Sequence, residues 1–405
     1  MRAFRCLVLI IAFFLAQKGF PQQTLWVTHW ADSGPGSLRE VISSASAGDI
    51  IRFVPNISSI TLSSAEIHIN KPIKIIGNED IITIKRNLSE STPHFRIFNI
   101  SYTDYPLDTL ILKNLNFKYG FSSDGDDENQ DGKDGGAIIA SNPNNIIKII
   151  NCQFTNNQCG NGITNLHVTT KSKKRADSGR GGHGGAIYSD AMLIIENCSF
   201  SLNETGSGGA IYLNNINWFI EAGIGGHGGA IACNSYLIIN DCLFNNNHTK
   251  SGGLAKSSSR YTSMALGGSA GYGGAIYCSS GVEIINTTFT GNSTGTGGTG
   301  IGDGWVMGVG GDGGHGGALF AIDSTACVTN CTFSENKAGD GGLEGGDGAA
   351  HGGSGGYGGC IYTKNAWIII DNCSFLNNTA GAGTSGSAYH AGLGGDGGSE
   401  EQYAL

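Results

Sequence analysis

The chain has 405 residues, of which 67 are glycine, and its formal net charge is −9. Glycine is far more frequent than the roughly 7% of an average protein, but the strict triplet spacing of collagen is absent, which excludes that fibre. The acidic balance argues against a nucleic-acid-binding surface. None of the 11 cysteines forms a Cys-x-x-Cys pair, so a zinc site is not expected.

Residues 1–20 are predicted to be a signal peptide. Arg2 and Arg5 precede the apolar run Cys6–Ala16, which is too short to span a bilayer and has the length of a secretory signal core. Cleavage after Ala16 and cleavage after Gly19 are both compatible with the sequence. No later segment is long and apolar enough for a membrane helix, so we expect an exported protein, extracellular or associated with the outer membrane or cell surface.

Residues 21–120 are predicted to form an N-terminal cap and the first coils of the fold. A short helix is expected over Ser37–Ser44, where it would cover strand edges that otherwise invite aggregation. Short apolar clusters, which we interpret as strands, follow at Ile57–Leu62, Ile67–Ile69, Ile73–Ile76, Ile81–Ile84, Ile97–Ile100 and Leu110–Phe117.

Residues 121–405 contain a repeated step, Asn-Cys-x-Phe or a close variant. Its copies end at Phe154, Phe200, Phe244, Phe289, Phe333 and Phe375, so successive copies are 46, 44, 45, 44 and 42 residues apart. A period this regular indicates a solenoid, a propeller or an array. The sequence around Asn114–Phe117 is a degenerate first copy.

A Gly-Gly-Ala-Ile opening accompanies the step and suggests a shorter unit. The opening at Gly184–Ile187 recurs at Gly208–Ile211, which is 24 residues later. We therefore predict a unit of about 24 residues, with the remaining Gly-rich residues of each period projecting as loops from one side of the stack.

The unit is predicted to be a coil of short β-strands. Leu193–Ile195 and Cys198–Phe200 are too short and too rich in β-branched or aromatic residues for helices, and Asn197 between them tolerates the left-handed backbone of a tight turn. Because a propeller blade needs four strands and the Gly-rich half offers no apolar alternation, a parallel β-helix is the remaining fold. Like residues would then stack in columns of Phe, Cys and Asn. The Asn that closes each copy, such as Asn203, would hydrogen-bond to its neighbours above and below.

Two sequence elements resemble known families of bacterial surface proteins. The segment Ala31–Ile42, ADSGPGSLREVI, is similar to the Cys-Ser-Leu-Arg-Glu-Ala signature of secreted bacterial proteins, with Gly36 and Val41 in place of the Cys and the Ala. The paired Gly-Gly-Ala-Ile and Phe-x-x-Asn elements resemble the repeats of chlamydial polymorphic membrane proteins. Both resemblances imply a right-handed parallel β-helix on a bacterial surface, usually in adhesion.

Two further predicted columns are candidate chemical sites. Five cysteines share the inward position, where buried thiols are favoured over disulfides between coils: Cys152, Cys198, Cys242, Cys331 and Cys373. Five rings precede the Gly pairs, where stacking is favoured over metal binding because tyrosines interrupt the histidines: His183, His227, Tyr272, His315 and Tyr357.

An acidic loop is the candidate metal site. Its carboxylates alternate with glycines, as in calcium loops, at Asp124, Asp126, Glu128, Asp131 and Asp134. A solvated acidic loop without a metal explains the same residues. No other cofactor is expected. Four basic residues, Lys171, Lys173, Lys174 and Arg175, form either a solvated loop or a contact for an anionic glycan or lipid.

The sequence favours an adhesin-like binding scaffold, whose partners would be glycans or proteins of a host or environmental surface. The alternative is a β-helix that binds or degrades polysaccharide, in the manner of pectate lyases. Glycoside hydrolysis needs two facing carboxylates, and the repeated strands carry Ile, Cys, Ser, Thr and Phe instead, so we expect no enzymatic activity. If the inserts are decoration, deletion of Thr262–Gly271 should leave folding intact and weaken attachment.

Overall fold

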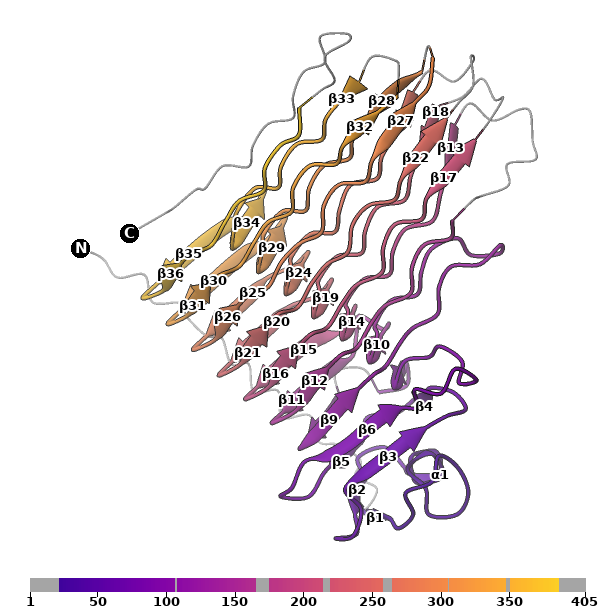
Figure 1. The fold of residues 1–405 in the computed structure, drawn as a ribbon. Coiled ribbons are helices and arrows are strands. Elements are labelled where there is room, and N and C mark those ends of the chain that lie inside the picture. The colour runs from indigo at the N-terminus through magenta and orange to yellow at the C-terminus, as the bar shows by residue number, and fades with distance from the viewer. Residues whose placement is uncertain are drawn as a thin grey trace.

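The computed structural model describes residues 22–105, 108–164, 175–213, 219–257, 264–304, 306–346 and 350–385. The chain winds into a stack of coils that starts at a small cap and grows in one direction (Figure 1). Every strand pairing within the described ranges is parallel, and partners come from successive coils. The predicted signal peptide, residues 1–20, lies outside the described residues.

Three sheets surround the main core. Sheet A has ten strands, in the order β1 (Thr24–Val27), β2 (Ile50–Phe53), β5 (Lys74–Ile76), β8 (Thr109–Lys113), β11 (Ile146–Ile150), β15 (Met192–Glu196), β20 (Leu237–Asn240), β25 (Val282–Ile285), β30 (Thr325–Thr329) and β35 (Trp367–Asp371). Sheet B has nine strands: β3 (Ser59–Leu62), β6 (Ile82–Arg86), β9 (Leu115–Lys118), β12 (Gln153–Thr155), β16 (Ser199–Ser201), β21 (Leu243–Asn245), β26 (Thr288–Thr290), β31 (Thr332–Ser334) and β36 (Ser374–Leu376). Sheet C has eight: β4 (Ile67–Ile69), β7 (Phe98–Ile100), β10 (Ile138–Ala140), β14 (Ile187–Ser189), β19 (Ile231–Cys233), β24 (Ile276–Cys278), β29 (Leu319–Ile322) and β34 (Ile361–Lys364). The prediction of a parallel β-helix is confirmed.

The phenylalanines of the repeated step form one buried column. The centroids of the Phe154 and Phe200 rings are 4.7 Å apart and those of Phe200 and Phe244 are 4.8 Å apart, with interplanar angles of 1° and 2°. The column begins at Phe117, whose ring stacks on Phe154 at 4.9 Å, so the degenerate first copy is confirmed. It ends at Phe375, which is 39% exposed.

The turn asparagines and the closing asparagines of each copy adopt the roles predicted from the sequence. Asn197 adopts φ 52°, and the equivalent turn residues share this left-handed conformation. The closing Asn203 is buried, donates from Nδ2 to Asn247 Oδ1 (2.9 Å), and donates from the same nitrogen to the Phe154 carbonyl of the preceding coil (3.0 Å). Each such amide thus bridges coils on both sides, and it leaves no buried polar atom of its own unpaired.

The cap contains the expected helix, α1 (Leu38–Ser44). Ser37 is its N-cap and accepts a hydrogen bond from the Glu40 backbone N–H, which satisfies one of the free donors of the first turn. Leu38, Val41 and Ile42 face the core at the open end of the stack. In the described part of the chain, no helix is long and apolar enough to cross a membrane.

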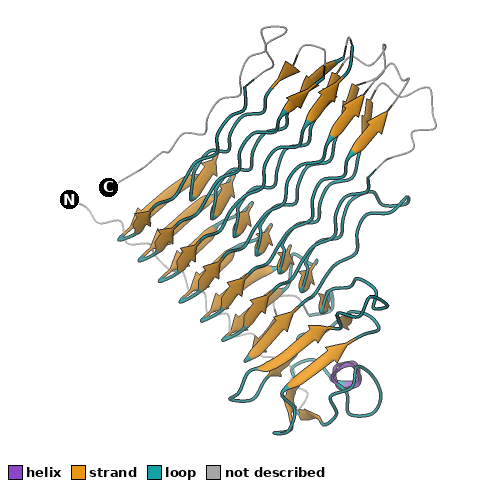
Figure 2. Cartoon of the chain, in the orientation of Figure 1, coloured by secondary structure: helices purple, strands orange, loops and turns teal. Residues whose placement is uncertain are grey.

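The Gly-rich inserts differ from the prediction, because most of each insert is ordered. Figure 2 shows them as legs that run side by side from the main sheets to strands at the far edge. These strands form two outer sheets. Outer sheet 1 contains β13 (Arg175–Asp177), β18 (Phe219–Glu221), β23 (Met264–Leu266), β28 (Met307–Val309) and β33 (Ala350–His351), and outer sheet 2 contains β17 (Ile211–Leu213), β22 (Ala255–Ser257), β27 (Gly300–Gly302) and β32 (Glu344–Gly345).

Backbone hydrogen bonds join the legs, and these bonds explain the glycines. Gly206 N donates to Gly182 O (3.1 Å) on the returning leg of the coil before, and Gly226 N donates to Gly206 O (2.9 Å). A Cβ on Gly226 would overlap the carbonyl oxygen of Gly182, so the legs can only pack this closely without side chains. The inserts are therefore structural layers with a small core of their own, which includes Ile211, Ile220 and Val306.

The predicted unit of about 24 residues is found where no insert interrupts the coil, because Ile50 pairs with Lys74 and Ser59 pairs with Thr83. The interpretation of the second opening is wrong, and the prediction for the loop deletion changes with it. The second opening, Gly208–Ile211, leads into β17 of outer sheet 2 and does not begin another main coil. In the coils that carry inserts the period is the longer one, because Ile187 of β14 pairs with Ile231 of β19, 44 residues later in the chain. The segment Thr262–Gly271 contains β23 and the buried Ala270, so its deletion should disrupt folding instead of leaving it intact.

Candidate functional site

The acidic loop does not gather its carboxylates around one point. Asp124 Oδ1 accepts the Asn161 backbone N–H (2.6 Å), Asp131 Oδ1 accepts that of Arg180 (2.7 Å), and Asp134 Oδ1 accepts that of His183 (2.6 Å). These three carboxylates therefore serve as acceptors for backbone donors of the following coil.

Asp126 makes its contacts within the loop itself, and Glu128 contributes its backbone N–H there. Asp126 Oδ1 caps a turn by accepting the N–H groups of Glu128 (3.1 Å) and Asn129 (2.7 Å). Within the described ranges, no three Asp, Glu, His or Cys side chains are grouped so that they could hold a metal ion. Calcium binding here stays a prediction without geometric support, and isothermal titration at millimolar calcium tests it. The basic residues Lys171, Lys173 and Lys174 lie outside the described residues, as does the Arg175 side chain.

The predicted column of rings is present at one corner of the coils. The centroids of the His183 and His227 rings are 4.8 Å apart, and the His227 ring lies 4.8 Å from Tyr272. The column continues from Tyr272 to His315 at 5.0 Å and from His315 to Tyr357 at 5.2 Å. Its rings stack face to face along the axis, so solvent meets their edges.

A second column of rings, which sequence reasoning missed, lies beside the first. It occupies the residue after four of the Gly-Gly-Ala-Ile openings or their equivalents, at Tyr188, Tyr277, Phe320 and Tyr362, whereas Ala232 follows the opening at Gly228–Ile231. The Tyr277 ring lies 4.9 Å from His227, and the Phe320 ring lies 4.9 Å from Tyr272. The aromatic residue at this recurring position was the signal that could have revealed the column.

The histidines of the first column also accept hydrogen bonds from the backbone. His183 Nδ1 accepts the His227 N–H (2.8 Å), His227 Nδ1 accepts the Tyr272 N–H (3.0 Å), and His315 Nδ1 accepts the Tyr357 N–H (2.9 Å). Because only an unprotonated nitrogen accepts, each ring must be neutral with its proton on Nε2. Burial lowers the pKa of all three rings, that of His227 furthest.

This column predicts loss of stability in mild acid. The unfolded histidines titrate near pH 6.5, above the folded ones, so below about pH 6.5 the unfolded chain binds more protons and is favoured. We expect the free energy of unfolding to be flat above pH 7 and to fall below it, by up to about 1.4 kcal/mol per pH unit for each histidine. Burial raises the pKa of Asp134, and protonation of that carboxyl in the folded state opposes the loss at more acid pH. Denaturant unfolding from pH 8 to pH 5 measures the effect.

A matched pair of variants assigns the acid sensitivity to the column. His227→Tyr keeps a ring in the stack and removes one titrating group, so the slope below pH 6.5 should decrease. His68→Gln changes an exposed histidine outside the column and should leave the slope unchanged. Equal slopes in all three proteins would show that other groups control the response.

The inward cysteines lie where they were predicted. Cys152, Cys198, Cys242 and Cys331 are buried thiols. The Cys152 backbone N–H donates to Cys198 Sγ (3.3 Å), and that of Cys198 donates to Cys242 Sγ (3.4 Å). Burial raises the pKa of Cys331 to about 11, so this thiol stays protonated at neutral pH. The geometry is that of a packed core, and it does not create a reactive nucleophile.

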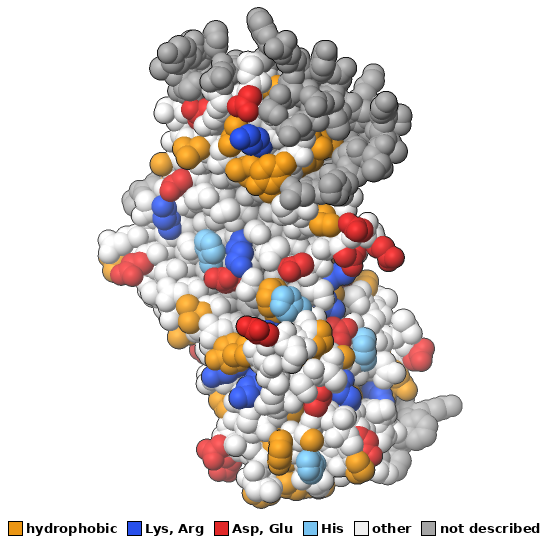
Figure 3. All heavy atoms as spheres, turned by 45° about the vertical axis from the view of Figure 1, so that its right-hand side comes forward, with side chains coloured by type: hydrophobic (Ala, Val, Ile, Leu, Met, Phe, Trp, Pro, Cys, Tyr) orange, Lys and Arg blue, Asp and Glu red, His pale blue; other side chains and the backbone are white. Residues whose placement is uncertain are grey.

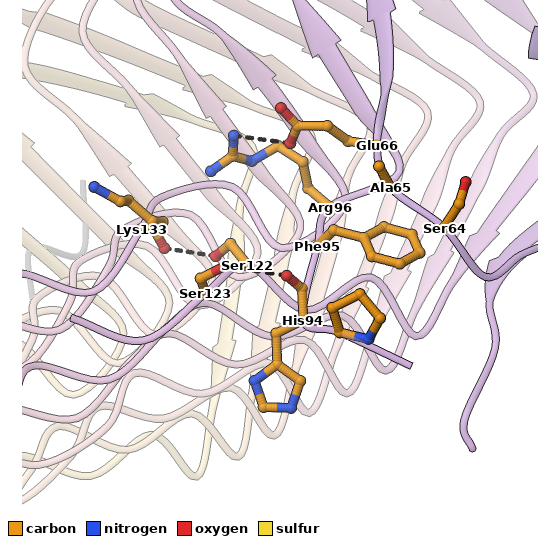
Figure 4. A pocket seen from close by; sticks show the side chains of 10 residues that line it. Ser64, Ala65, Glu66, His94, Phe95, Arg96, Ser122, Ser123 and Lys133 are labelled. Atoms are coloured by element: carbon orange, nitrogen blue, oxygen red, sulfur yellow. Dashed lines mark hydrogen bonds and ion pairs between the residues drawn. The ribbon is translucent and has the colours of Figure 1, made fainter. Parts of the chain in front are cut away.

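A pocket of about 410 Å³ opens at the corner between the cap and the first insert. Its walls are residues 64–66 before β4, 93–96 before β7, 122–123 after β9, and Lys133 before β10 (Figure 4). The connection between sheets B and C lengthens here, from residues 87–97 to residues 119–137 and then 156–186. The pocket lies at the step where the longer connections extend beyond the shorter ones. No local sequence pattern predicted it.

The repeat has a counterpart among known families. Residues 151–190 match the family model of the Chlamydia polymorphic membrane protein repeat. Most of one period of the chain, residues 151–190, is therefore similar to that repeat. The matched segment begins at the turn residue Asn151, includes Phe154 of the buried column and the pair Gly184–Gly185, and ends just beyond β14. The resemblance of Ala31–Ile42 to the secreted-protein signature stays a prediction.

Comparison with solved structures gives weak likenesses. Two structures of PfbA, a surface adhesin of Streptococcus pneumoniae, are similar at 10% sequence identity and a TM-score of 0.25. One match covers 84% of this chain and 87% of that chain, and the other covers 89% and 98%. ORF18 of Geobacillus virus E2 is similar at 10% identity and a TM-score of 0.22, over 87% of this chain and 61% of that one. No curated protein matches the sequence. Likenesses of this strength show nothing about the function of this chain.

Proposed function

We propose that this protein is an adhesin-like scaffold of a bacterial cell surface, which binds glycans or proteins of another surface. The observation that carries the proposal is the polymorphic membrane protein repeat at residues 151–190, since that repeat is named for a membrane protein. The predicted signal peptide is consistent with export. The stacked coils suit the role because a hydrogen-bonded rod resists bending and holds its edges at a fixed pitch of about 4.8 Å per coil.

The outer sheets are the parts best placed to meet a partner. They lie at the edge of the molecule farthest from the main core (Figure 1). Tyr212 on β17 is 49% exposed, and Leu343 beside β32 is 61% exposed. On the face drawn in Figure 3, one group of hydrophobic side chains lies near this edge beside acidic and basic side chains, and other hydrophobic groups lie lower on the molecule. Repeated weak contacts along such an edge would act together.

Attachment assays test the proposal. Beads coated with the full mature chain should adhere to a host-cell or glycan surface, and the double variant Tyr212→Ala, Leu343→Ala should reduce adhesion several-fold. The matched control Trp26→Ala, Leu88→Ala removes similarly exposed residues near the cap. Absence of adhesion to every surface, or equal loss in both double variants, would refute the proposal.

We also propose that the scaffold has no polysaccharide-cleaving activity. Asp241 occupies a left-handed turn, where its Oδ1 accepts from Asn286 (3.2 Å) and its Oδ2 from Asn240 (2.9 Å). Asp371 ends β35 at the exposed last coil. The Asp241 and Asp371 carboxylates therefore do not face each other across a space that one glycosidic bond could occupy. Incubation with a polysaccharide panel should release no product, and release of oligosaccharides would favour the alternative of a degrading enzyme.

A further inference from the structure

In the part of the chain that the structure describes, the pocket between the cap and the first insert is lined by one cation that has no acceptor partner, Lys133. Both oxygens of its carboxylate are already used: Glu66 Oε2 pairs with Arg96 Nη1 (3.0 Å), and Glu66 Oε1 accepts from Asn99 Nδ2 (2.8 Å). Arg96 Nε also has no hydrogen-bond partner, but its burial keeps it out of reach of a ligand in the pocket. Among the described residues, nothing pairs with the Lys133 ammonium group. A ligand that completes the pocket must therefore supply acceptors.

The charges around the pocket also favour a ligand that carries a negative charge. Glu66 neutralises Arg96 in an ion pair whose side chains are only 19% and 12% exposed. Asp134 also lies near Arg96, but its Oδ1 accepts the His183 N–H and so faces the next coil. Lys133 is the cation left without a counter-charge. An anionic group beside Lys133 would balance it.

The walls of the pocket are held in place before any ligand arrives. Arg39 of the cap helix donates to the carbonyl oxygens of Ala65 (2.6 Å) and Glu66 (2.7 Å). Ser123 Oγ donates to the His94 carbonyl (3.0 Å), and the His94 ring stacks on Phe121 with centroids 3.8 Å apart. Figure 4 shows Ser123 beside the His94 carbonyl, with the Glu66–Arg96 ion pair on the other side of the lining. A preformed site loses little conformational entropy on binding.

We propose that this pocket binds the anionic group, carboxylate or sulfate, of an acidic saccharide, with Lys133 as its charge partner. A volume of about 410 Å³ is more than a lone anion fills and lies in the range of small-molecule sites. The Ser64 and Ser123 hydroxyls at the rim suit the hydroxyls of a sugar. The choice of a saccharide rests on the proposed adhesive function, whereas the anionic chemistry rests on the pocket alone.

Calorimetric titration of the full mature chain tests the site. The probes are sialyllactose and trigalacturonate for the carboxylate, a heparin disaccharide for the sulfate, lactose as the neutral control, and inorganic phosphate and sulfate as free anions. At least one acidic saccharide should bind, more weakly at high salt because the site is open. Lys133→Gln should weaken binding about ten-fold or more, as loss of a charged hydrogen-bond partner does. Lys256→Gln, on β22 of outer sheet 2, should leave affinity unchanged.

The outcomes separate this inference from the proposed function. No heat with any acidic saccharide, equal affinity for lactose or free anions, or an unchanged affinity in Lys133→Gln would overturn the pocket assignment. Adhesion of coated beads in the same preparation would then still support the scaffold role. Saccharide binding without adhesion would refute the scaffold role and leave the pocket standing. Circular dichroism of Lys133→Gln verifies folding, which should persist because Lys133 contributes only backbone groups to the stack.

Discussion

Phe200→Ala should lower the free energy of unfolding by about 3–5 kcal/mol, the range for truncation of a fully buried phenylalanine. Phe200 is 0% exposed and stacks on Phe154 below and Phe244 above, so the substitution removes two ring contacts and opens a cavity between coils. Stability in a solenoid is approximately a sum over units and their interfaces, so the loss should appear in the total unfolding free energy. Denaturant titration followed by circular dichroism measures it.

Phe375→Ala is the matched control in the same column. Phe375 is 39% exposed and stacks only on Phe333, at 5.3 Å. We expect a loss of less than about 2 kcal/mol, because a partly exposed ring has less apolar area to lose. If the two variants lost the same stability, the column would not be the continuous core that its geometry indicates.

Gly226→Ala should cost about 3 kcal/mol or more, at the upper end of over-packing effects. The new Cβ would overlap the carbonyl oxygen of Gly182 and lie 3.0 Å from Thr205 Cβ. The Gly182 carbonyl oxygen belongs to the backbone and cannot rotate away, so the segment around Gly226 must shift. We expect this shift to lengthen the hydrogen bond from Gly226 N to Gly206 O. Amide hydrogen exchange should show lost protection in outer sheets 1 and 2, with protection retained around the phenylalanine column.

Gly345→Ala provides the comparison for the legs. A Cβ there would meet first the Ile301 side chain, with Cγ1 at 3.3 Å, and that side chain can move. The expected loss is below about 1 kcal/mol, as for most substitutions outside tightly packed contacts. A neutral Gly226→Ala would mean that the legs behave as flexible linkers, against the hydrogen-bonded layers described above.

Much of the main coil was determined by the sequence alone. Alternation places Cys198 and Phe200 on one face of a strand, Asn197 supplies the left-handed turn, and Ser37 caps the helix, all through interactions between residues close in the chain. The period of about 44 residues then aligned these local features into columns, because each coil repeats the same geometry. The buried Asn203 bridge and the stacked rings at His183 and His227 followed from the same reasoning.

Only the tertiary structure decided the arrangement of the Gly-rich inserts and the pocket. Glycine has no side chain, so its sequence shows no apolar alternation, and the order of the legs comes from backbone bonds such as Gly206 N to Gly182 O, which join different coils. The opening at Gly208–Ile211 has the same sequence as the opening of a main coil. It nevertheless leads into outer sheet 2, because its neighbours in space differ. The pocket likewise depends on the distance between Glu66, Arg96 and Lys133, which belong to three successive coils. Contacts between coils, and not local residue patterns, set both features.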